Sequence, residues 1–307
     1  MCADRRRMSF RGTNPPVVTQ ALGRTVVATL LAVLTAIPAA GRPDEPDPAP
    51  DDRSTPAAGE PDRFNRFASK LSPDEPLYFV LGWRDGTNAK FQLSFKYRFV
   101  NPEGQLTDDV PFFGHVYFGY TQTSLWDLDS DSKPFFDTSY RPSLFYREES
   151  LHEWDDGRGW WWGQIGIEHE SNGQGGEDSR SLNIVYVQPV LELDRALGTA
   201  HLTVAPRVWA YLGSLDDNPD LPDYRGYGEL RLAVTGRSEW QVAAIARIGT
   251  SGKGSVQADF TYPLDRLFLR TFDAFFHVQV FNGWGESLRT YDQRLPWQIR
   301  IGVAAIR

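Results

Sequence analysis

The chain of 307 residues is poor in the groups from which many protein sites are built. It holds one cysteine, Cys2, and that residue falls in a segment that we expect to be removed. A mature chain without cysteine excludes disulfide scaffolds, thiolate zinc sites and cysteine nucleophiles. The Gly-x-Ser-x-Gly elbow of soluble hydrolases, the His-Glu-x-x-His zinc motif and the phosphate-binding loop are also missing from the sequence.

The chain also lacks positive net charge and long apolar runs. Its net charge is −8, which argues against nucleic-acid binding because that function needs a basic patch. Beyond Thr25–Ala36, no apolar stretch could form a membrane-spanning helix, which needs roughly 20 residues. Hydrophobic residues still make up 41% of the chain, with ten tryptophans. They must therefore lie in shorter segments that are buried or in contact with a membrane.

The first 72 residues have the composition of export and linker segments. Residues 1–40 combine an arginine cluster with the apolar run Thr25–Ala36 and then the small residues Ala39-Ala40-Gly41, which is the pattern of a signal peptide. A transmembrane anchor is the alternative, but the run is too short for a span. Residues 41–72 are interpreted as a Pro/Asp-rich linker and N-terminal segment, and residues 73–307 as the folded domain.

From residue 73 onward, apolar and polar residues alternate in segment after segment. Near the end of the chain, for example, Trp297, Ile299 and Ile301 alternate with Gln298 and Arg300. A period of two predicts β-strands with one apolar face. Twelve segments are candidates: 76–84, 89–100, 112–124, 141–148, 159–170, 180–194, 199–213, 225–236, 239–249, 254–262, 267–282 and 295–306.

This pattern predicts an all-β fold, a transmembrane antiparallel β-barrel of about 12 strands. Tight connections at Asp194–Gly198 and Arg237-Ser238 alternate with long ones such as 125–140, as expected for short periplasmic turns and longer extracellular loops. A soluble β-sandwich also alternates and is the alternative. Aromatic residues such as Trp160-Trp161-Trp162 favour the barrel, because they collect at membrane interfaces. An even strand number would place the loop 171–180 at the outer-leaflet end.

The most distinctive stretch, Glu168–Asn183, joins two predicted strands. His169 and Ser171 are two residues apart and therefore share one face of a strand. Asn183 follows His169 by 14 positions, and the midpoint falls at Gly175-Gly176, where a hairpin tip is expected. Folding the chain there places Asn183 opposite His169. A hydroxyl, an imidazole and an amide then meet in the order of a nucleophile, its base and the group that orients the base.

The neighbouring residues indicate which face carries this site. Ile165 and Ile167 share its parity in the first strand, and Val185 and Val187 share it in the second. The site therefore lies on the apolar face, which in a membrane barrel is the lipid-facing exterior. In a soluble sandwich the same face would be the core, where no substrate could reach it.

The motif His169-x-Ser171-Asn172-Gly173, followed by Ser179-Arg180-Ser181-x-Asn183, resembles the signature of outer-membrane phospholipase A, the calcium-dependent dimeric lipases of Gram-negative outer membranes. Further matches lie at Tyr120-Thr121-Gln122, Trp126, Asn218-Pro219-Asp220 and Gly283-x-Gly285-Glu286-Ser287-Leu288. The resemblance implies that Ser171 is the nucleophile, His169 the general base and Asn183 the orienting residue. It also implies phospholipase A1 and A2 activity, and hydrolysis of lysophospholipids, in the cell outer membrane.

The resemblance further implies a Ca²⁺ cofactor and a homodimer as the active form. The Gly173 N–H would hold the oxyanion together with calcium. The Gln174 carbonyl and the Ser179 hydroxyl would bind the ion from one subunit, and the Ser132 carbonyl from the other. Gln122 would be a polar residue of the dimer interface at membrane depth.

Asp217 matches an acidic position of a second calcium site in that family, but the expected partner position is Gly176. Two other functions stay open at this point, a non-catalytic barrel such as a porin and a soluble secreted esterase. Conductance, hydrolysis and partitioning between buffer and detergent would separate the three.

Overall fold

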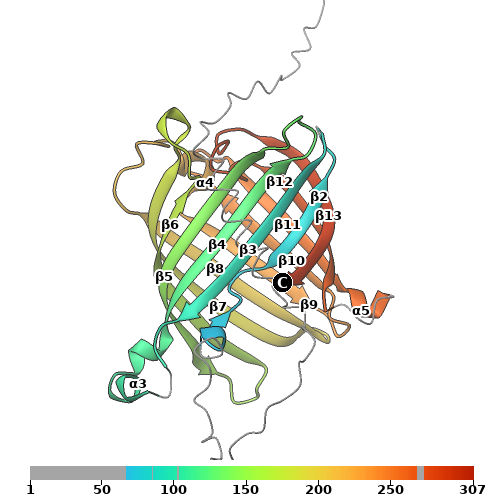
Figure 1. Cartoon of the computed structure of the whole chain (residues 1–307). Coiled ribbons are helices and arrows are strands. Elements are labelled where there is room, and N and C mark those ends of the chain that lie inside the picture. The colour runs from blue at the N-terminus through green and yellow to red at the C-terminus, as the bar shows by residue number, and fades with distance from the viewer. Residues whose placement is uncertain (1–66, 85, 102–103, 268–272) are drawn as a thin grey trace, which may run out of the picture. The chain divides into compact units, whose positions relative to one another are not determined.

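The alternating segments pair side by side into one antiparallel sheet that closes on itself (Figure 1). The computed structural model describes residues 67–84, 86–101, 104–267 and 273–307. Within them, twelve strands, β2 to β13, each pair with their neighbours in sequence, and β13 pairs with β2 to complete the ring. The predicted antiparallel barrel of about 12 strands is confirmed. The predicted signal peptide, residues 1–40, and most of the predicted linker lie outside the described residues.

The barrel strands are β2 (Leu77–Gly82), β3 (Asn88–Arg98), β4 (Val116–Asp127), β5 (Phe135–Glu153), β6 (Gly159–Ser171), β7 (Ser181–Leu197), β8 (Ala200–Tyr211), β9 (Gly228–Thr235), β10 (Gln241–Ile248), β11 (Gly254–Pro263), β12 (Phe275–Gly283) and β13 (Leu295–Ile306). A two-residue strand, β1 (Leu71–Ser72), pairs with β3. The helical segments are α3 (Gln105–Asp109), η1 (Pro111–His115), η2 (Gly176–Asp178), α4 (Pro222–Arg225) and α5 (Leu264–Leu267). Among the described residues, no helix has the length and apolar character to cross a membrane.

Several of the predicted strand bounds were wrong, and three strands begin four or more residues away from the predicted start. The segment 112–124 begins with the 3-10 helix η1, because Pro111 lacks the N–H that a strand ladder requires, and β4 starts only at Val116. β5 begins at Phe135, inside the predicted loop 125–140, since its first residues pair with the end of β4. β12 begins at Phe275 rather than at 267, after the short helix α5.

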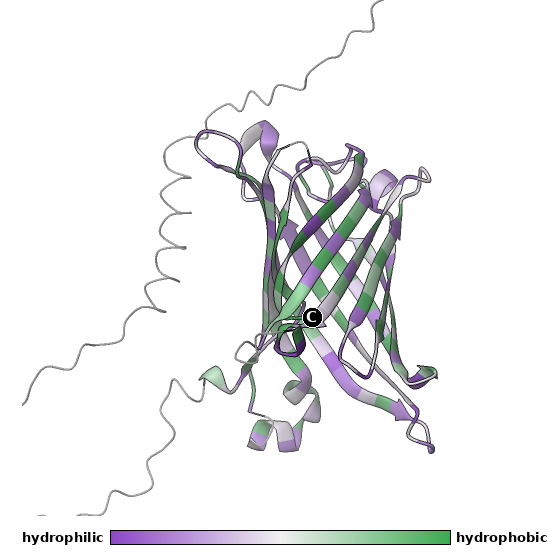
Figure 2. Ribbon diagram, turned by 90° about the vertical axis from the view of Figure 1, so that its right-hand side faces the viewer, coloured by the Kyte–Doolittle hydropathy of each residue, from purple (hydrophilic) through white to green (hydrophobic). Residues whose placement is uncertain are grey.

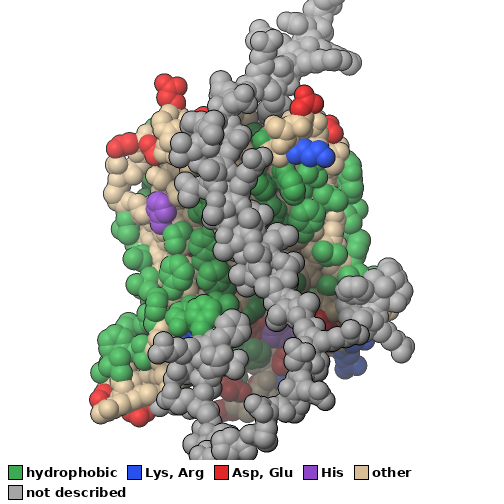
Figure 3. Space-filling view, viewed as in Figure 1, with side chains coloured by type: hydrophobic (Ala, Val, Ile, Leu, Met, Phe, Trp, Pro, Cys, Tyr) green, Lys and Arg blue, Asp and Glu red, His purple; other side chains and the backbone are tan. Residues whose placement is uncertain are grey.

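Side chains point alternately out of the barrel and into its interior. In β13, Trp297 and Ile299 are each 55% exposed, whereas Gln298 and Arg300, which alternate with them, are 7% and 4% exposed. The same alternation runs along the other strands and is visible as bands of hydropathy in Figure 2. Figure 3 shows hydrophobic side chains over the outer wall and charged side chains mainly towards the two ends. The exterior is therefore an apolar surface and the interior is polar.

The interior is filled by charged side chains that neutralise one another. Three buried pairs cross it, with nitrogen–oxygen distances of 3.2 Å for Lys90–Glu286 and 3.0 Å for both Arg207–Glu168 and Arg225–Glu170. Buried charges are tolerated when they are paired and hydrogen-bonded.

Residues 73–76, just before β2, also enter the interior. Asp74 pairs with Arg147 at 2.7 Å, and Glu75 pairs with Arg141 at 3.1 Å and with Arg231 at 3.4 Å. The Glu75 backbone N–H also donates to the Ser94 hydroxyl at 3.0 Å. This segment is called the N-terminal strap below.

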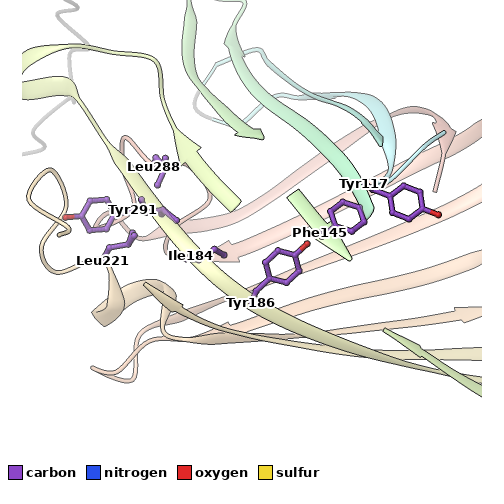
Figure 4. Close-up of a cluster of buried hydrophobic side chains, with 8 residues drawn as sticks. Tyr117, Phe145, Ile184, Tyr186, Leu221, Leu288 and Tyr291 are labelled. Atoms are coloured by element: carbon purple, nitrogen blue, oxygen red, sulfur yellow. The ribbon is translucent and has the colours of Figure 1, made fainter. Parts of the chain in front are cut away.

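The two ends of the barrel differ. The connections 128–134, 172–180, 212–227 and 284–294 lie at one end, where Leu221, Leu288 and Tyr291 pack on Ile184 of β7 and cover the barrel mouth (Figure 4). The connections 154–158, 198–199 and 236–240 at the other end are short, as predicted. Two connections at that end are longer: the one between β3 and β4, which contains α3 and η1, and the one between β11 and β12, which contains α5.

Candidate active site

The pairing of β6 with β7 brings the predicted site together. The register sets His169 opposite Asn183 and Ser171 opposite Ser181, as the midpoint of the sequence motif predicts. All four residues share the parity of Ile165, Ile167 and Val187, which are exposed on the outer wall. The candidate site is therefore on the apolar exterior of the barrel and not in its interior.

His169 and Asn183 form a hydrogen bond with 2.9 Å between Nδ1 and Oδ1. Because an amide oxygen can only accept, this bond requires the proton to be on Nδ1 of the imidazole. Nε2 then keeps its lone pair and is available as a proton acceptor on the same surface. Asn183 thus selects the tautomer in which His169 can act as a base.

Ser171 is the last residue of β6 and lies beside Tyr140 of β5. Its hydroxyl makes no hydrogen bond to any residue that the structure describes, including His169, although the two side chains share one face two residues apart. Contacts between a nucleophile and its base are often long in the absence of substrate. The structure thus brings together the imidazole and the amide and presents the hydroxyl next to them.

Gly173 follows in the loop and has a backbone conformation that favours glycine, with φ of +65°. A Cβ atom there would lie 2.9 Å from Cε2 of Tyr140, so the position is closed to larger residues on steric grounds as well. Among the described residues, the Gly173 N–H has no hydrogen-bond acceptor. It is free to donate to a ligand beside Ser171.

Asn172 organises this loop, a role that the sequence analysis did not assign. The side chain is 1% exposed. Its Nδ2 donates to the Asp178 carbonyl at 2.9 Å, and its Oδ1 accepts from the backbone N–H of Arg180 at 3.0 Å and of Gln174 at 3.3 Å. The Asn-Gly dipeptide was the available signal, because asparagine often bonds to the backbone of a turn.

Two of the predicted calcium ligands lie in the same loop. The Ser179 hydroxyl donates to Oδ2 of Asp217 at 2.8 Å, and the Ser181 hydroxyl donates to the same oxygen at 3.3 Å. Gln174 lies five residues before Ser179 and leaves its carbonyl free of any partner that the structure describes. Hydroxyl, carboxylate and carbonyl oxygens are the donors that calcium prefers, so this set suits the ion.

The remaining positions implied for calcium are Ser132 and Gly176. Ser132 is in the loop between β4 and β5, which is fixed by a hydrogen bond of 2.7 Å from Trp126 Nε1 to the Lys133 carbonyl. Gly176 contributes no side chain, so the second calcium site lacks the acidic partner of Asp217 there. In the described part of the chain, no cluster of three or more His, Cys, Asp or Glu residues is arranged to hold a metal.

Gln122 belongs to a polar row on the otherwise apolar outer wall. Its Oε1 accepts from the Tyr120 hydroxyl at 3.0 Å, and its Nε2 donates to the Ser124 hydroxyl at 3.2 Å. Ser124 in turn is hydrogen-bonded to Thr138 at 3.0 Å. Gln122 is also the register partner of Tyr140, which is the register partner of Ser171 on its other side. The polar row therefore runs next to the site.

The fold is a closed twelve-stranded barrel, and His169, Asn183 and Ser171 lie next to one another on its apolar outer surface. A family model described as phospholipase A1 matches residues 65–305, so the chain belongs to the phospholipase A1 family.

Individual relatives agree with this assignment. A putative phospholipase A1 of Neisseria meningitidis is 30% identical over 221 residues, which cover 69% of this chain and 53% of the relative, so the chain spans about half the length of that protein. The phospholipase A1 of Klebsiella pneumoniae is 30% identical over 261 residues, or 76% of this chain and 80% of the relative. The outer membrane phospholipase dimer of Salmonella typhi with bound calcium has the same fold, with a TM-score of 0.64 at 24% identity over 81% of this chain and 94% of that one.

Proposed function

We propose that this protein is a calcium-dependent phospholipase of the outer membrane that hydrolyses acyl ester bonds of phospholipids at its lipid-facing surface. The observation that carries the proposal is the His169–Asn183 hydrogen bond on the apolar outer wall, two residues from Ser171. A site in this position receives its substrate sideways from the bilayer. Membership of the phospholipase A1 family supports the same class of substrate.

The three side chains divide the chemistry of ester hydrolysis between them. Oγ of Ser171 attacks the ester carbonyl carbon while Nε2 of His169 takes the hydroxyl proton. The tetrahedral intermediate then expels the lysophospholipid alcohol, which receives that proton, and an acyl group remains on Ser171. Water, deprotonated by His169, attacks the acyl-enzyme, releases the fatty acid and restores the serine. The Gly173 N–H stabilises the oxyanion in both steps.

An asparagine suits the orienting position on this surface. A carboxylate facing lipid would carry a large desolvation cost, whereas a neutral amide accepts the Nδ1 hydrogen bond without a buried charge. Asn183 fixes the tautomer of His169 but provides less stabilisation of the imidazolium than aspartate would. Positive charge from a metal would offset that weakness.

Calcium, when bound, adds positive charge beside the oxyanion. The Gln174 carbonyl and the Ser179 hydroxyl would hold it from one copy of the chain, with Asp217 beside Ser179, and the Ser132 carbonyl would hold it from a second copy. The polar row around Gln122 gives two barrels a hydrogen-bonding contact next to the site. Activity in this proposal therefore depends on a homodimer, and the calcium-bound dimer of the Salmonella typhi relative supports that dependence.

The apolar outer wall and the even number of strands support a place in the outer membrane, with both ends of the barrel domain 73–307 on the periplasmic side. A signal peptide at residues 1–40 and a linker at 41–72 precede that domain. The loop 172–180 and the site then face the outer leaflet. Cleavage at either acyl position, and of lysophospholipids, is expected because the substrate does not enter a deep pocket.

The two alternative functions have less support. A porin needs a water-filled passage, whereas this interior is crossed by buried ion pairs and by the N-terminal strap. A soluble esterase would need another way to cover the outer wall, on which many large apolar side chains are exposed.

The proposal is tested with refolded protein in mixed micelles that contain calcium and a phosphatidylcholine with different acyl chains at its two positions. Release of both fatty acids, and labelling of Ser171 by a long-chain alkyl phosphonofluoridate with loss of fluoride, are the expected results. The labelled residue is located by peptide mass spectrometry. A folded protein that releases neither fatty acid, or that takes up the phosphonate on another residue, would contradict the proposal. Release of one fatty acid alone would show that the enzyme cleaves only one of the two acyl positions, and would contradict the proposed cleavage at both.

A further inference from the structure

The long connection between β3 and β4 exposes several large apolar side chains at the end of the barrel opposite Ser171. The α3–η1 segment (residues 104–115) leaves the barrel at the lower left of Figure 1. Within twelve residues it exposes Leu106, Val110, Phe112 and Phe113, with Phe112 at 52%. Exposing each such side chain to water instead of an apolar medium costs about 1.5–3 kcal/mol, so a surface of this kind indicates a contact.

The apolar and the acidic side chains of the α3–η1 segment lie on different parts of its surface. Leu106 of α3 and Val110, which caps its C-terminal end, are four residues apart and are joined by a hydrogen bond of 2.9 Å from the Val110 N–H to the Leu106 carbonyl, while Asp108 and Asp109 lie between them. Figure 3 shows the same separation, with hydrophobic atoms next to the barrel wall and acidic atoms at the outer tip. The segment is therefore amphipathic, although it is too short to be stable as an isolated helix.

Several contacts fix the α3–η1 segment against the outer wall. Phe112 stacks on Tyr146 of β5 with ring centroids 4.8 Å apart and planes within 8°. His115 is hydrogen-bonded through Nδ1 to the Arg147 carbonyl at 3.1 Å. η1 packs on α3 at Gly114, where a Cβ would lie 2.7 Å from the Thr107 methyl carbon. The exposed aromatic rings are thus held in a defined orientation.

The aromatic surface of the segment continues into the apolar outer wall of the barrel. Tyr97, Phe99 and Phe118 follow one another at centroid distances of 5.7 Å and 6.4 Å on β3, its C-terminal extension and β4. Polar groups begin where these aromatic rings end: the ring of Tyr146 stacks on Phe112, and its hydroxyl donates to Glu148 at 2.7 Å. Aromatic rings beside hydrogen-bonding and charged groups are the composition of a membrane–water boundary.

From this arrangement we infer that the α3–η1 segment is an interfacial anchor, which inserts Phe112 and Phe113 among the lipids of the leaflet at the barrel end opposite the active site. Leu106 and Val110 lie along that boundary, and Asp108 and Asp109 remain in water. The anchor widens the lipid-contacting surface on the β3–β5 side only, which is also the side of the polar row. The inference relies on the proposed membrane location but not on catalysis.

Depth-dependent fluorescence quenching tests this inference on the full chain with Cys2→Ser. An environment-sensitive fluorophore is attached to Phe112→Cys, Phe113→Cys or Asp108→Cys, and to Ile301→Cys on the barrel wall as the membrane reference. The proteins are refolded into phosphatidylcholine vesicles that carry nitroxides on the acyl chains. Labels at 112 and 113 should be quenched at least twofold more strongly than the label at 108, and should be protected from iodide.

Three results would overturn the inference. If the label at 301 is quenched while those at 112 and 113 behave like that at 108, the segment lies in water. If 112 and 113 are protected from both quenchers and lose that protection when the protein is diluted in lipid, a second copy covers them instead. Failure of quenching at 301 as well would reject the membrane location itself, and the anchor with it.

Discussion

His169 and Asn183 occupy directly paired positions of β6 and β7, and 2.9 Å separates Nδ1 of the imidazole from the amide oxygen. The pair lies on the outer wall, so its formation does not depend on the polar interior. It depends on the register of one hairpin, and a shift of one strand by one residue would place the two side chains on opposite faces of the sheet.

The first prediction concerns this hydrogen bond. Asn183→Ala should lower kcat about 100-fold, since His169 then loses the acceptor that holds its tautomer. The fold should remain intact because Asn183 is exposed and packs against no core residue. Val185→Ala, two residues along on the same face, is the matched control and should keep nearly full activity. Equal losses in the two variants would argue that the surface as a whole, and not the hydrogen bond, supports catalysis.

The loop that follows Ser171 gives a second prediction. Gly173→Ala places a methyl group 2.9 Å from the Tyr140 ring and strains the backbone at φ of +65°, so the N–H should move away from the oxyanion. We expect kcat to fall at least about tenfold with little change in KM. Gly176→Ala has the same φ and open space around its Cβ, so it reports the backbone strain alone. Similar kcat values for the two variants would mean that the Gly173 N–H does not stabilise the oxyanion.

Calcium dependence is the third prediction. A chelator should abolish fatty-acid release and shift the protein from dimer to monomer, as measured by chemical cross-linking. Ser179→Ala should raise the calcium concentration needed for half-maximal activity by about tenfold, because one oxygen ligand is lost. Ser214→Ala removes a similar serine–aspartate contact, to Asp216 at 2.7 Å, and should leave the calcium requirement unchanged. An unchanged dimer under chelation would mean that the ion does not join the subunits.

The wall of the barrel could be predicted from the sequence because strand periodicity is local. Each strand shows its own alternation, and residues such as Ile299 and Arg300 fix its inward and outward faces without knowledge of any other segment. The His169–Asn183 pairing was equally accessible, since one hairpin tip determines it. The bounds of β5 were not, because Phe135–Tyr140 becomes a strand only by pairing with β4.

The contacts across the interior and between the loops could not be predicted from local patterns. Glu75 meets Arg231 across 156 positions of sequence, and Ser179 meets Asp217 across 38. Such contacts depend on how the ring closes and on how the loops fold over its mouth. The role of Asn172 was hidden for a related reason, since its partners are backbone groups that carry no residue-specific signal.

The N-terminal strap leads to the fourth prediction. Burial alone would raise the pKa of Glu75, but Arg141 and Arg231 lower it from the ordinary 4.5 to about 2. A carboxyl group with a depressed pKa stabilises the folded state above pH 4.5 and loses that contribution as the pH falls from 4.5 towards 2. The barrel should therefore conduct few ions at neutral pH and more as the pH falls towards 2, where Glu75 takes up a proton in the folded state, as measured in planar bilayers.

Glu75→Gln should conduct at neutral pH and should unfold more easily, by about 3 kcal/mol, because Arg141 loses its carboxylate partner and Arg231 keeps only Glu229. Gln92→Ala, which removes hydrogen bonds to the Pro76 carbonyl and the Thr123 hydroxyl but no charge, is the control. High conductance of the unmodified protein at neutral pH would instead support a porin.

The central claim is that the Ser171 hydroxyl on the outer wall carries out ester cleavage. Its most direct test is the rate of fatty-acid release by Ser171→Ala in phospholipid mixed micelles with calcium, compared with the unmodified protein and with Val185→Ala. The variant must show the electrophoretic shift of a folded barrel. The account predicts a loss of activity of at least about 1,000-fold in Ser171→Ala alone. Hydrolysis at the rate of the unmodified protein would show that another group performs the reaction.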